Sequence, residues 1–268
     1  MGRVWHFIRN TPAVTLEFGP RTVRSLSAAA WLLLVTVTPA RAEPFGWPQV
    51  QGVGTPVVLT YSFINLLDPA FQGISEAELR ASTAQALGLW AQYAPLHFIE
   101  RPDSGPPASD QNYFPDGHPD IRIGAHDEGE GEILAHAFLP LATNVSGLDG
   151  DIHFNSDSIL PWGIESGFPA IDFLEVMVHE LGHALGMQHV MDVEAIMNPF
   201  HGFRFGRASA FLLGPDIDGI QAIYGAGVGS VAPIPEPSTF MLVFAGPVVA
   251  LIRRMHNNRS RHASADSG

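Results

Sequence analysis

The chain has 268 residues, of which 27 are acidic and 14 are basic, and every basic residue is an arginine because lysine is absent. The formal charge of −13 argues against binding of nucleic acid or of an anionic membrane surface by the folded part of the chain. Cysteine is absent as well, which excludes disulfides, thiol catalysis and thiolate metal sites. Any metal must therefore be bound by histidine, carboxylate or carbonyl groups.

The first 42 residues have the pattern of a secretory signal peptide. Arg21 and Arg24 precede an apolar run at 26–37, which leads to the triplet Ala-Arg-Ala at 40–42. A basic flank, a short apolar stretch and an A-x-A site predict export, with cleavage at the end of that triplet. The alternative interpretation of this stretch is an ordinary buried helix.

The following residues predict one mixed domain at 57–226, after an extended Pro-, Gly- and Gln-rich leader at 43–56. β-Branched, aromatic or alternating runs predict strands at 57–63, 96–100, 120–124, 133–139 and 151–154. Helical spacing of apolar residues predicts helices at 76–93 (with Ser75 as N-cap), 170–187 and 214–224. This order of one helix, several strands and two further helices indicates a mixed α/β layout with a small sheet.

The stretch with the clearest chemical meaning is H-E-L-G-H-A-L-G-M-Q-H, which begins at His179. His179 and His183 are four residues apart on a helix, so both imidazoles lie on one face and can bind one ion. Gly186 lets the chain leave the helix with positive φ, and the return brings His189 round as a third ligand. Three imidazoles and one open position are typical of catalytic zinc, and Glu180 beside them can accept a proton from water. The alternative is an amphipathic helix with core histidines.

This motif, followed by Met197 in the sequence A-I-M-N-P, resembles the metzincin metalloproteases, in which a methionine turn lies beneath the zinc ligands. Further stretches resemble the catalytic domains of the matrixin branch, and they lie at 59–63, 120–123, 134–138, 150–154 and 216–225. The resemblance covers about 56–225 and implies the α+β fold of a metzincin catalytic domain. This fold has a small mixed, twisted sheet, three helices and an active-site cleft below an edge strand. It also implies peptide-bond hydrolysis with Glu180 as general base and substrate extended along 133–137.

The matrixin resemblance implies further site residues. A second, structural zinc is expected at His126, Glu128, His136 and His153. Asp127 is the alternative carboxylate, and exposed histidines without metal are the alternative to the site. One calcium ion is expected at Asp120, Gly147, Asp149 and Asp151, unless these acids form only a solvated surface. Substrate contacts are expected at Leu134, Ala135, Pro199 and Phe200.

The C-terminal part begins with a linker at 227–234 and ends with a polar tail at 257–268. Between them, Pro-Glu-Pro at 235–237 precedes an apolar run at 239–252 and two arginines. This order resembles the PEP-CTERM sorting signal of Gram-negative bacteria, here at 235–256. It implies an exosortase-type processing enzyme as partner and transient anchoring in the inner membrane through 239–252. The alternative is a simple membrane tail anchor, and both predict a cell-surface or extracellular location.

We therefore expect an exported zinc endopeptidase that acts on proteins or peptides, contains zinc and calcium, and has no nucleic-acid partner. One alternative is a surface or biofilm-matrix adhesion protein that keeps a metzincin shell without proteolysis. The intact Glu180 disfavours it, because a structural relic needs no base. Another is a zinc hydrolase with a non-peptide substrate, which the matrixin-like strands disfavour.

Overall fold

The computed structural model of the chain divides into two compact units, 1–232 and 233–268. The residues it describes are 3–4, 45–67, 71–111, 117–129, 133–140, 147–158, 160–166, 170–201 and 210–232. The expected signal peptide, apart from two residues, and the expected sorting signal lie outside this set. Among the helices within it, none has the length and apolar character needed to cross a membrane.

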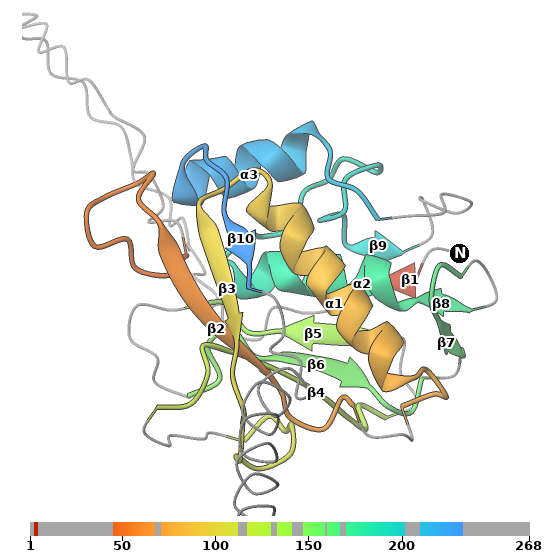
Figure 1. Ribbon diagram of the computed structural model, residues 1–268. Helices are drawn as coiled ribbons and strands as arrows, with labels where there is room; N and C mark the ends of the chain where they lie inside the picture. Colours follow the sequence, from red (N-terminus) through yellow and green to blue (C-terminus); the bar gives the residue numbers. More distant parts are fainter. Residues whose placement is uncertain are drawn as a thin grey trace, which may run out of the picture. The chain divides into compact units, whose positions relative to one another are not determined.

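A six-stranded sheet forms the centre of the first unit, in the order β10-β3-β2-β4-β6-β5 (Figure 1). The strands are β2 (Val57–Phe63), β3 (Leu96–Glu100), β4 (Ile121–His126), β5 (Ala135–Ala137), β6 (Ile152–Asn155) and β10 (Ser230–Val231). All neighbouring pairs are parallel except β5 and β6, which are antiparallel. The expected mixed sheet is thus confirmed, and β5 lies at its edge.

The strand bounds agree closely with the sequence for β2 and β3 and differ slightly for the others. β4 begins at Ile121 because the carboxylate of Asp120 accepts hydrogen bonds from the Thr60 amide (2.7 Å) and hydroxyl (2.6 Å). Two short pairs were not expected, since two residues carry no periodic signal. They are β1 (Arg3–Val4) with β9 (Phe200–His201), antiparallel, and β7 (Trp162–Gly163) with β8 (Ile171–Asp172), parallel.

The first helix, α1 (Glu76–Ala91), begins at a capping box formed by Ser75 and Glu78, as the N-cap prediction requires. It packs against α2 (Phe173–Ala184), as Figure 1 shows. The indole Nε1 of Trp90 on α1 donates a hydrogen bond to the carbonyl of Val178 at 3.0 Å. Trp90 is fully buried, so this hydrogen bond helps to fix the position of α2 against α1.

The helix α2 is shorter than predicted at both ends. It starts at Phe173 because Ile171 and Asp172 form β8, and the Asp172 carboxylate caps the amide of Leu174 (3.0 Å). It stops near Gly186, whose φ of 95° is open to glycine and strained for other residues. Phe173 stacks on Phe154 of β6 with ring centroids 4.7 Å apart, so the start of α2 is tied to the sheet.

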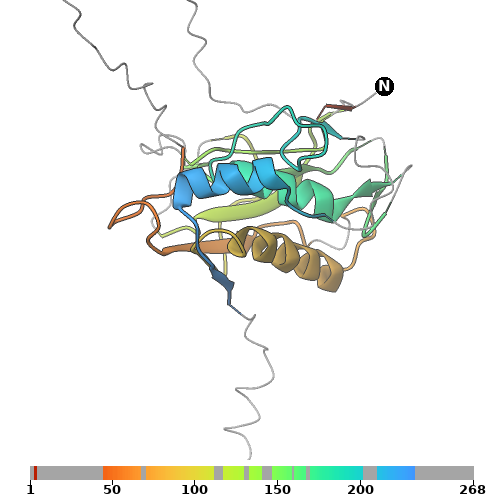
Figure 2. The same cartoon turned by 90° about the horizontal axis from the view of Figure 1, so that it is seen from above.

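The third helix, α3 (Gly214–Tyr224), has the predicted bounds. After it the chain returns to the sheet as β10, which also lies against α1 (Figure 1 and Figure 2). The residues expected as a linker therefore include a strand, and the Gly229 amide donates to Ala91 (2.7 Å).

The expected leader crosses the ends of α2 and α3. Trp47 Nε1 donates to the carbonyl of Ala184 (3.0 Å), and Gln49 Nε2 donates to the carbonyl of Ile223 (2.8 Å). The Tyr224 hydroxyl accepts from the Trp47 amide and donates to the carbonyl of Leu185. The segment is thus held against the point where the chain leaves α2.

Candidate metal centres

Three histidines meet at the C-terminal end of α2. His179 and His183 lie on one face of the helix with ring centroids 4.8 Å apart, and His189 lies 5.3 Å and 4.7 Å from them. One ring nitrogen from each falls within 4.8 Å of the others, which is the arrangement that a single metal ion needs. The structure therefore brings together all three residues that the motif predicts as zinc ligands.

Main-chain carbonyls orient the first two imidazoles. His179 Nδ1 bonds to the carbonyl of Ile196 (2.7 Å), and His183 Nδ1 bonds to the carbonyl of Met187 (2.8 Å). A carbonyl only accepts, so each Nδ1 carries the proton and each Nε2 keeps its lone pair for a metal. His183 Nε2 lies 3.1 Å from His189 Nε2, a separation that suits two ligands of one ion. The donor set thus fits zinc.

Glu180 lies on α2 between the two histidine ligands and is fully buried. Neither of its carboxylate oxygens has a hydrogen-bond partner among the described residues. Burial raises the pKa of Glu180 to about 8, although the positive charge of His136 lowers it somewhat. A buried carboxylate with a raised pKa beside three imidazoles is typical of a group that takes up and releases a proton during catalysis.

The predicted methionine turn packs directly beneath α2. Met197 is fully buried. A Cβ added to Gly182 would stand only 2.3 Å from the Met197 sulfur, so a larger residue at 182 would collide with it. Asp216 at the start of α3 holds the turn in place, because its carboxylate accepts from the amides of Ile196 (3.0 Å) and Met197 (3.1 Å). Since Ile196 orients His179, Asp216 acts on the histidine site through one main-chain carbonyl.

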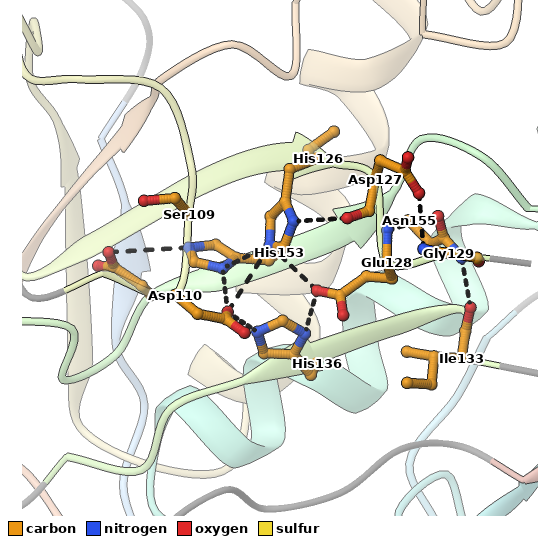
Figure 3. Close-up of polar contacts among 12 residues, drawn as sticks. Ser109, Asp110, His126, Asp127, Glu128, Gly129, Ile133, His136, His153 and Asn155 are labelled. Carbon is orange, nitrogen blue, oxygen red and sulfur yellow. Dashed lines mark hydrogen bonds and ion pairs between the residues drawn. The ribbon is translucent and has the colours of Figure 1, made fainter. Parts of the chain in front are cut away.

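A second group of histidines lies over β4, β5 and β6 (Figure 3). His136 and His153 are paired across β5 and β6, and His126 ends β4. His126 Nε2 lies 3.3 Å from His153 Nδ1. The structure thus brings together the three imidazoles that the resemblance assigns to a structural zinc.

Two carboxylates approach these imidazoles. Glu128 Oε1 lies 3.0 Å from His126 Nε2 and 2.9 Å from His136 Nδ1. Asp110 Oδ1 lies 3.1 Å from His136 Nε2, and it forms the compact four-residue group with the histidines. Asp127, the alternative carboxylate, points elsewhere: its side chain accepts from the Gly129 amide, and its carbonyl bonds to His126 Nδ1 (3.1 Å).

The charges in this second group are strongly coupled. Burial would lower the pKa of His136, but Asp110 and Glu128 raise it to about 9. Burial would raise the pKa of Glu128, but the close imidazoles of His126 and His136 lower it to about 2. Burial lowers the pKa of His153 to about 4. Two carboxylates thus hold positive charge at this position, and a divalent cation can replace the protons.

The residues expected to bind calcium lie close together, with different partners. One carboxylate oxygen of Asp120 accepts hydrogen bonds from Thr60, and its carbonyl oxygen lies beside the 147–151 turn, where a Cβ on Gly150 would stand 2.6 Å from it. Asp149 and Asp151 are buried. The carboxylate oxygens of Asp151 have no hydrogen-bond partner among the described residues, and Arg122 Nη1 lies 3.6 Å from one of them. Burial raises the pKa of Asp151 well above its usual value.

The residues expected to contact substrate belong to two segments, one before and one after the first histidine group in the chain. Leu134 and Ala135 are buried at the edge strand β5, and Ala135 is paired with Phe154. Pro199 and Phe200 are half-buried and follow Asn198, whose side chain donates to the carbonyl of Asp192 (3.0 Å) and accepts from the Phe200 amide (3.0 Å).

Sequence reasoning missed two residues that take part in these centres, Asp110 and Asp216. Asp110 lies in a Pro-, Gly- and Asp-rich loop where no spacing relates it to the distant histidines. Asp216 lies in one of the matrixin-like stretches, but its bonds to the methionine turn depend on how α3 packs, which the sequence does not encode.

Comparison with known proteins identifies relatives of this region. The Matrixin family profile (peptidase family M10) matches residues 54–225. Human matrix metalloproteinase-16 is 35% identical over 180 residues, which cover 62% of this chain and 26% of that protein. Stromelysin-3 of Xenopus laevis is 34% identical over 174 residues, 62% of this chain and 31% of that protein. Matrix metalloproteinase-C of Caenorhabditis elegans is 33% identical over 187 residues, 64% of this chain and 28% of that protein. The chain thus matches between a quarter and a third of the length of these relatives.

Proposed function

The chain belongs to the matrixin family, and from this premise we propose that it is a zinc-dependent endopeptidase that hydrolyses peptide bonds in proteins or peptides. The observation that carries the proposal is the convergence of three imidazoles beside the buried carboxylate of Glu180. His179, His183 and His189 would hold the zinc, with one coordination position left open.

Zinc at this site supplies a Lewis acid that polarises the scissile carbonyl and makes a water molecule acidic near neutral pH. The Glu180 carboxylate accepts the proton of the attacking water and then delivers it to the leaving amine. A nearby divalent cation favours the ionised form of Glu180, which offsets the effect of burial on its pKa. The carbonyls of Ile196 and Met187 keep Nδ1 protonated on His179 and His183, which leaves each Nε2 as the ligand atom.

The edge strand β5 offers main-chain groups to an extended substrate, in the manner of an added β-strand. This is supported by the position of β5 at the end of the sheet and by its contact with α2. Pro199 and Phe200 would lie on the opposite side, after the methionine turn.

The second histidine group would bind a structural zinc, and Asp151 with the carbonyls around it would bind one calcium ion. The first is supported by the compact group of three imidazoles with carboxylates, and the second by the buried Asp151 carboxylate. From the sequence alone we further propose an exported protein that is sorted to the cell surface through the PEP-CTERM-like segment and an exosortase-type enzyme.

The proposal is tested with the full chain, loaded with zinc and calcium, against a mixed peptide library read by mass spectrometry. We expect Glu180→Gln to keep its zinc and to lose cleavage by a factor of about 10²–10⁴, the usual contribution of general acid–base catalysis. The control is Glu175→Ala, which changes a carboxylate on the same helix but outside the histidine group.

Cleavage that survives in Glu180→Gln would show that another group handles the proton. A folded wild-type chain that binds zinc but cuts no peptide would overturn the endopeptidase proposal. That result would favour the adhesion protein, or the non-peptide hydrolase if a small ester or amide is turned over.

A further inference from the structure

We propose that Asp110 is the fourth ligand of the second histidine site and that Glu128 supports His136 from outside the coordination sphere. This inference rests on the proposed metal occupancy of that site and goes beyond it in the identity of the carboxylate ligand. It differs from the ligand set that the family resemblance implies, in which Glu128 or its neighbour Asp127 supplies the carboxylate.

The first argument is the separation of the four candidate ligand atoms. Asp110 Oδ1 lies 3.1 Å from His136 Nε2, 3.6 Å from His153 Nδ1 and 3.7 Å from His126 Nε2. The two nitrogens of His126 and His153 are 3.3 Å apart. A tetrahedral zinc with bonds of about 2.0–2.1 Å places its ligand atoms about 3.3–3.4 Å apart. Asp110 Oδ1 therefore stands at one corner of such a tetrahedron, with three imidazole nitrogens at the others (Figure 3).

The second argument is the side from which each carboxylate approaches His136. Asp110 faces Nε2, whereas Glu128 lies 2.9 Å from Nδ1, the other ring nitrogen. The two nitrogens of one imidazole point in different directions and cannot bind the same ion. If Nε2 binds the metal, Nδ1 carries the proton and faces the Glu128 carboxylate as an ion-pair partner, similar to the carboxylate–histidine–metal arrangement common around zinc.

The third argument concerns His126, where the two carboxylates compete. Its Nδ1 bonds to the carbonyl of Asp127, so its Nε2 is the ligand atom. Glu128 lies closer to this Nε2 (3.0 Å) than Asp110 does (3.7 Å). However, Glu128 faces Nδ1 of His136 and not Nε2, so it does not complete a site in which Nε2 of His136 is a ligand. Asp110 is the carboxylate that reaches the ligand nitrogens of all three histidines.

The balance of charge in this buried group favours the presence of both carboxylates, with Asp110 as a ligand and Glu128 beside a ligand. The side chains of His136, His153 and Glu128 are almost completely buried, so an excess of charge here is costly. A divalent cation with Asp110 as ligand keeps one positive charge, and Glu128 beside His136 neutralises it. The side chain of Asp110 is partly exposed. Its loop is anchored a second time by Asp103, which bonds to the buried Arg122 at 2.7 Å.

The absence of cysteine from the chain allows a direct spectroscopic test. Asp110→Cys and its matched counterpart Glu128→Cys each introduce one thiol, and both are loaded with Co²⁺. The longer metal–sulfur bond of about 2.3 Å partly compensates for the shorter cysteine side chain. We expect a thiolate-to-cobalt charge-transfer band in the near ultraviolet for Asp110→Cys and none for Glu128→Cys. A band in Glu128→Cys alone would overturn the inference.

A second measurement covers the case in which a cysteine variant does not fold. Zinc per chain and its release to a chelator are measured for wild type, Asp110→Asn and Glu128→Gln. We expect the affinity of the second zinc to fall more than about 100-fold in Asp110→Asn, and about 10–100-fold in Glu128→Gln, as for outer partners of metal ligands.

The reverse order of these two losses would overturn the assignment of Asp110 while the structural-zinc proposal stands. A wild-type chain that binds only one zinc would overturn both. Neither result bears on the endopeptidase proposal, which is tested separately through Glu180.

Discussion

The two histidine groups are built from similar side chains but are assembled in opposite ways. The first takes its three ligands from one helix and the few residues after it, between His179 and His189. The second draws on a loop and three strands, from Asp110 to His153. The first is therefore fixed mainly by local helix geometry, whereas the second exists only when the sheet and its covering loop are in place. We expect loss of the first to remove activity and loss of the second to remove stability.

The largest effect is expected from His183→Ala. Loss of one of three zinc ligands should reduce peptide cleavage by about 10³-fold or more, since the metal-assisted step then fails. Because the ligands lie on a helix that tertiary packing holds, circular dichroism should still report the native fold. The control is His118→Ala, a histidine outside both groups. An unfolded His183→Ala chain would break the contrast between the two sites.

His153→Ala tests the other half of the contrast. His153 is fully buried on β6, and its loss removes one proposed ligand of the structural zinc and leaves a void. Structural zinc sites contribute folding free energy directly, so we expect a loss of about 4 kcal/mol or more in denaturant unfolding. If the unfolding midpoint equals that of wild type, the second group is not a structural metal site.

Asp103→Asn tests the anchor of the loop that carries Asp110. Removing one partner of the buried pair with Arg122 should cost about 3 kcal/mol, because the buried guanidinium loses its nearest carboxylate and keeps only the more distant Asp151 at 3.6 Å. Although burial alone would raise it, hydrogen bonds from Arg122, Gly105 and Ser62 hold the pKa of Asp103 below its usual value.

A carboxyl group with a lowered pKa stabilises the fold above its unfolded pKa and loses that contribution as pH falls through the folded value. The unfolding free energy of wild type should therefore decrease as pH drops below about 4, and part of this decrease should be missing in Asp103→Asn. Identical pH profiles for the two proteins would contradict the assignment of the pair.

Asp216→Asn should have a smaller effect that touches the first site alone. The carboxylate accepts from the amides of Ile196, Met197 and Leu213, and an amide side chain can replace only part of these bonds. We expect the free energy of unfolding to fall by about 2 kcal/mol. Zinc should also dissociate faster from the first site, since Ile196 orients His179. Faster release from the second site instead would show that the two groups are coupled.

Tyr224→Phe is expected to have the smallest effect. The hydroxyl links Trp47 to Leu185, so its loss removes two hydrogen bonds at the end of α2 and should cost about 1 kcal/mol. Thermal unfolding measures it, with Tyr93→Phe as the matched control. A loss above about 3 kcal/mol would show that the leader contributes more to the first site than these bonds suggest.

The sequence predicts the first group well because every relation within it is local. Histidines four apart and a glycine three residues later are enough to place three imidazoles together, and the bounds of α1, α3 and the long strands follow from periodicity in the same way. The carboxylate of the second group is different. Asp110 reaches His136 only because a loop folds back over the sheet. The neighbours Asp127 and Glu128 point their side chains in different directions, and residue spacing does not encode which of them faces the histidines.

The strand β10 was also beyond prediction, since Ser230 and Val231 carry no alternating pattern and follow several glycines. It pairs because Gly227 and Gly229 allow the chain to pass close to Pro95 and Leu96, where a Cβ at residue 229 would collide with the Leu96 carbonyl. The close approach, rather than any propensity, makes this strand.

That added strand also bears on self-association. A sheet with two bare edges can grow in both directions by accepting strands from other copies, which is a route to aggregates. Here β10 covers β3 and becomes the edge strand itself, and with two residues it offers few main-chain groups to a further strand. Under the proposed function an extended substrate would add at β5, so a short strand at the other border limits pairing between copies to the side that the substrate would use.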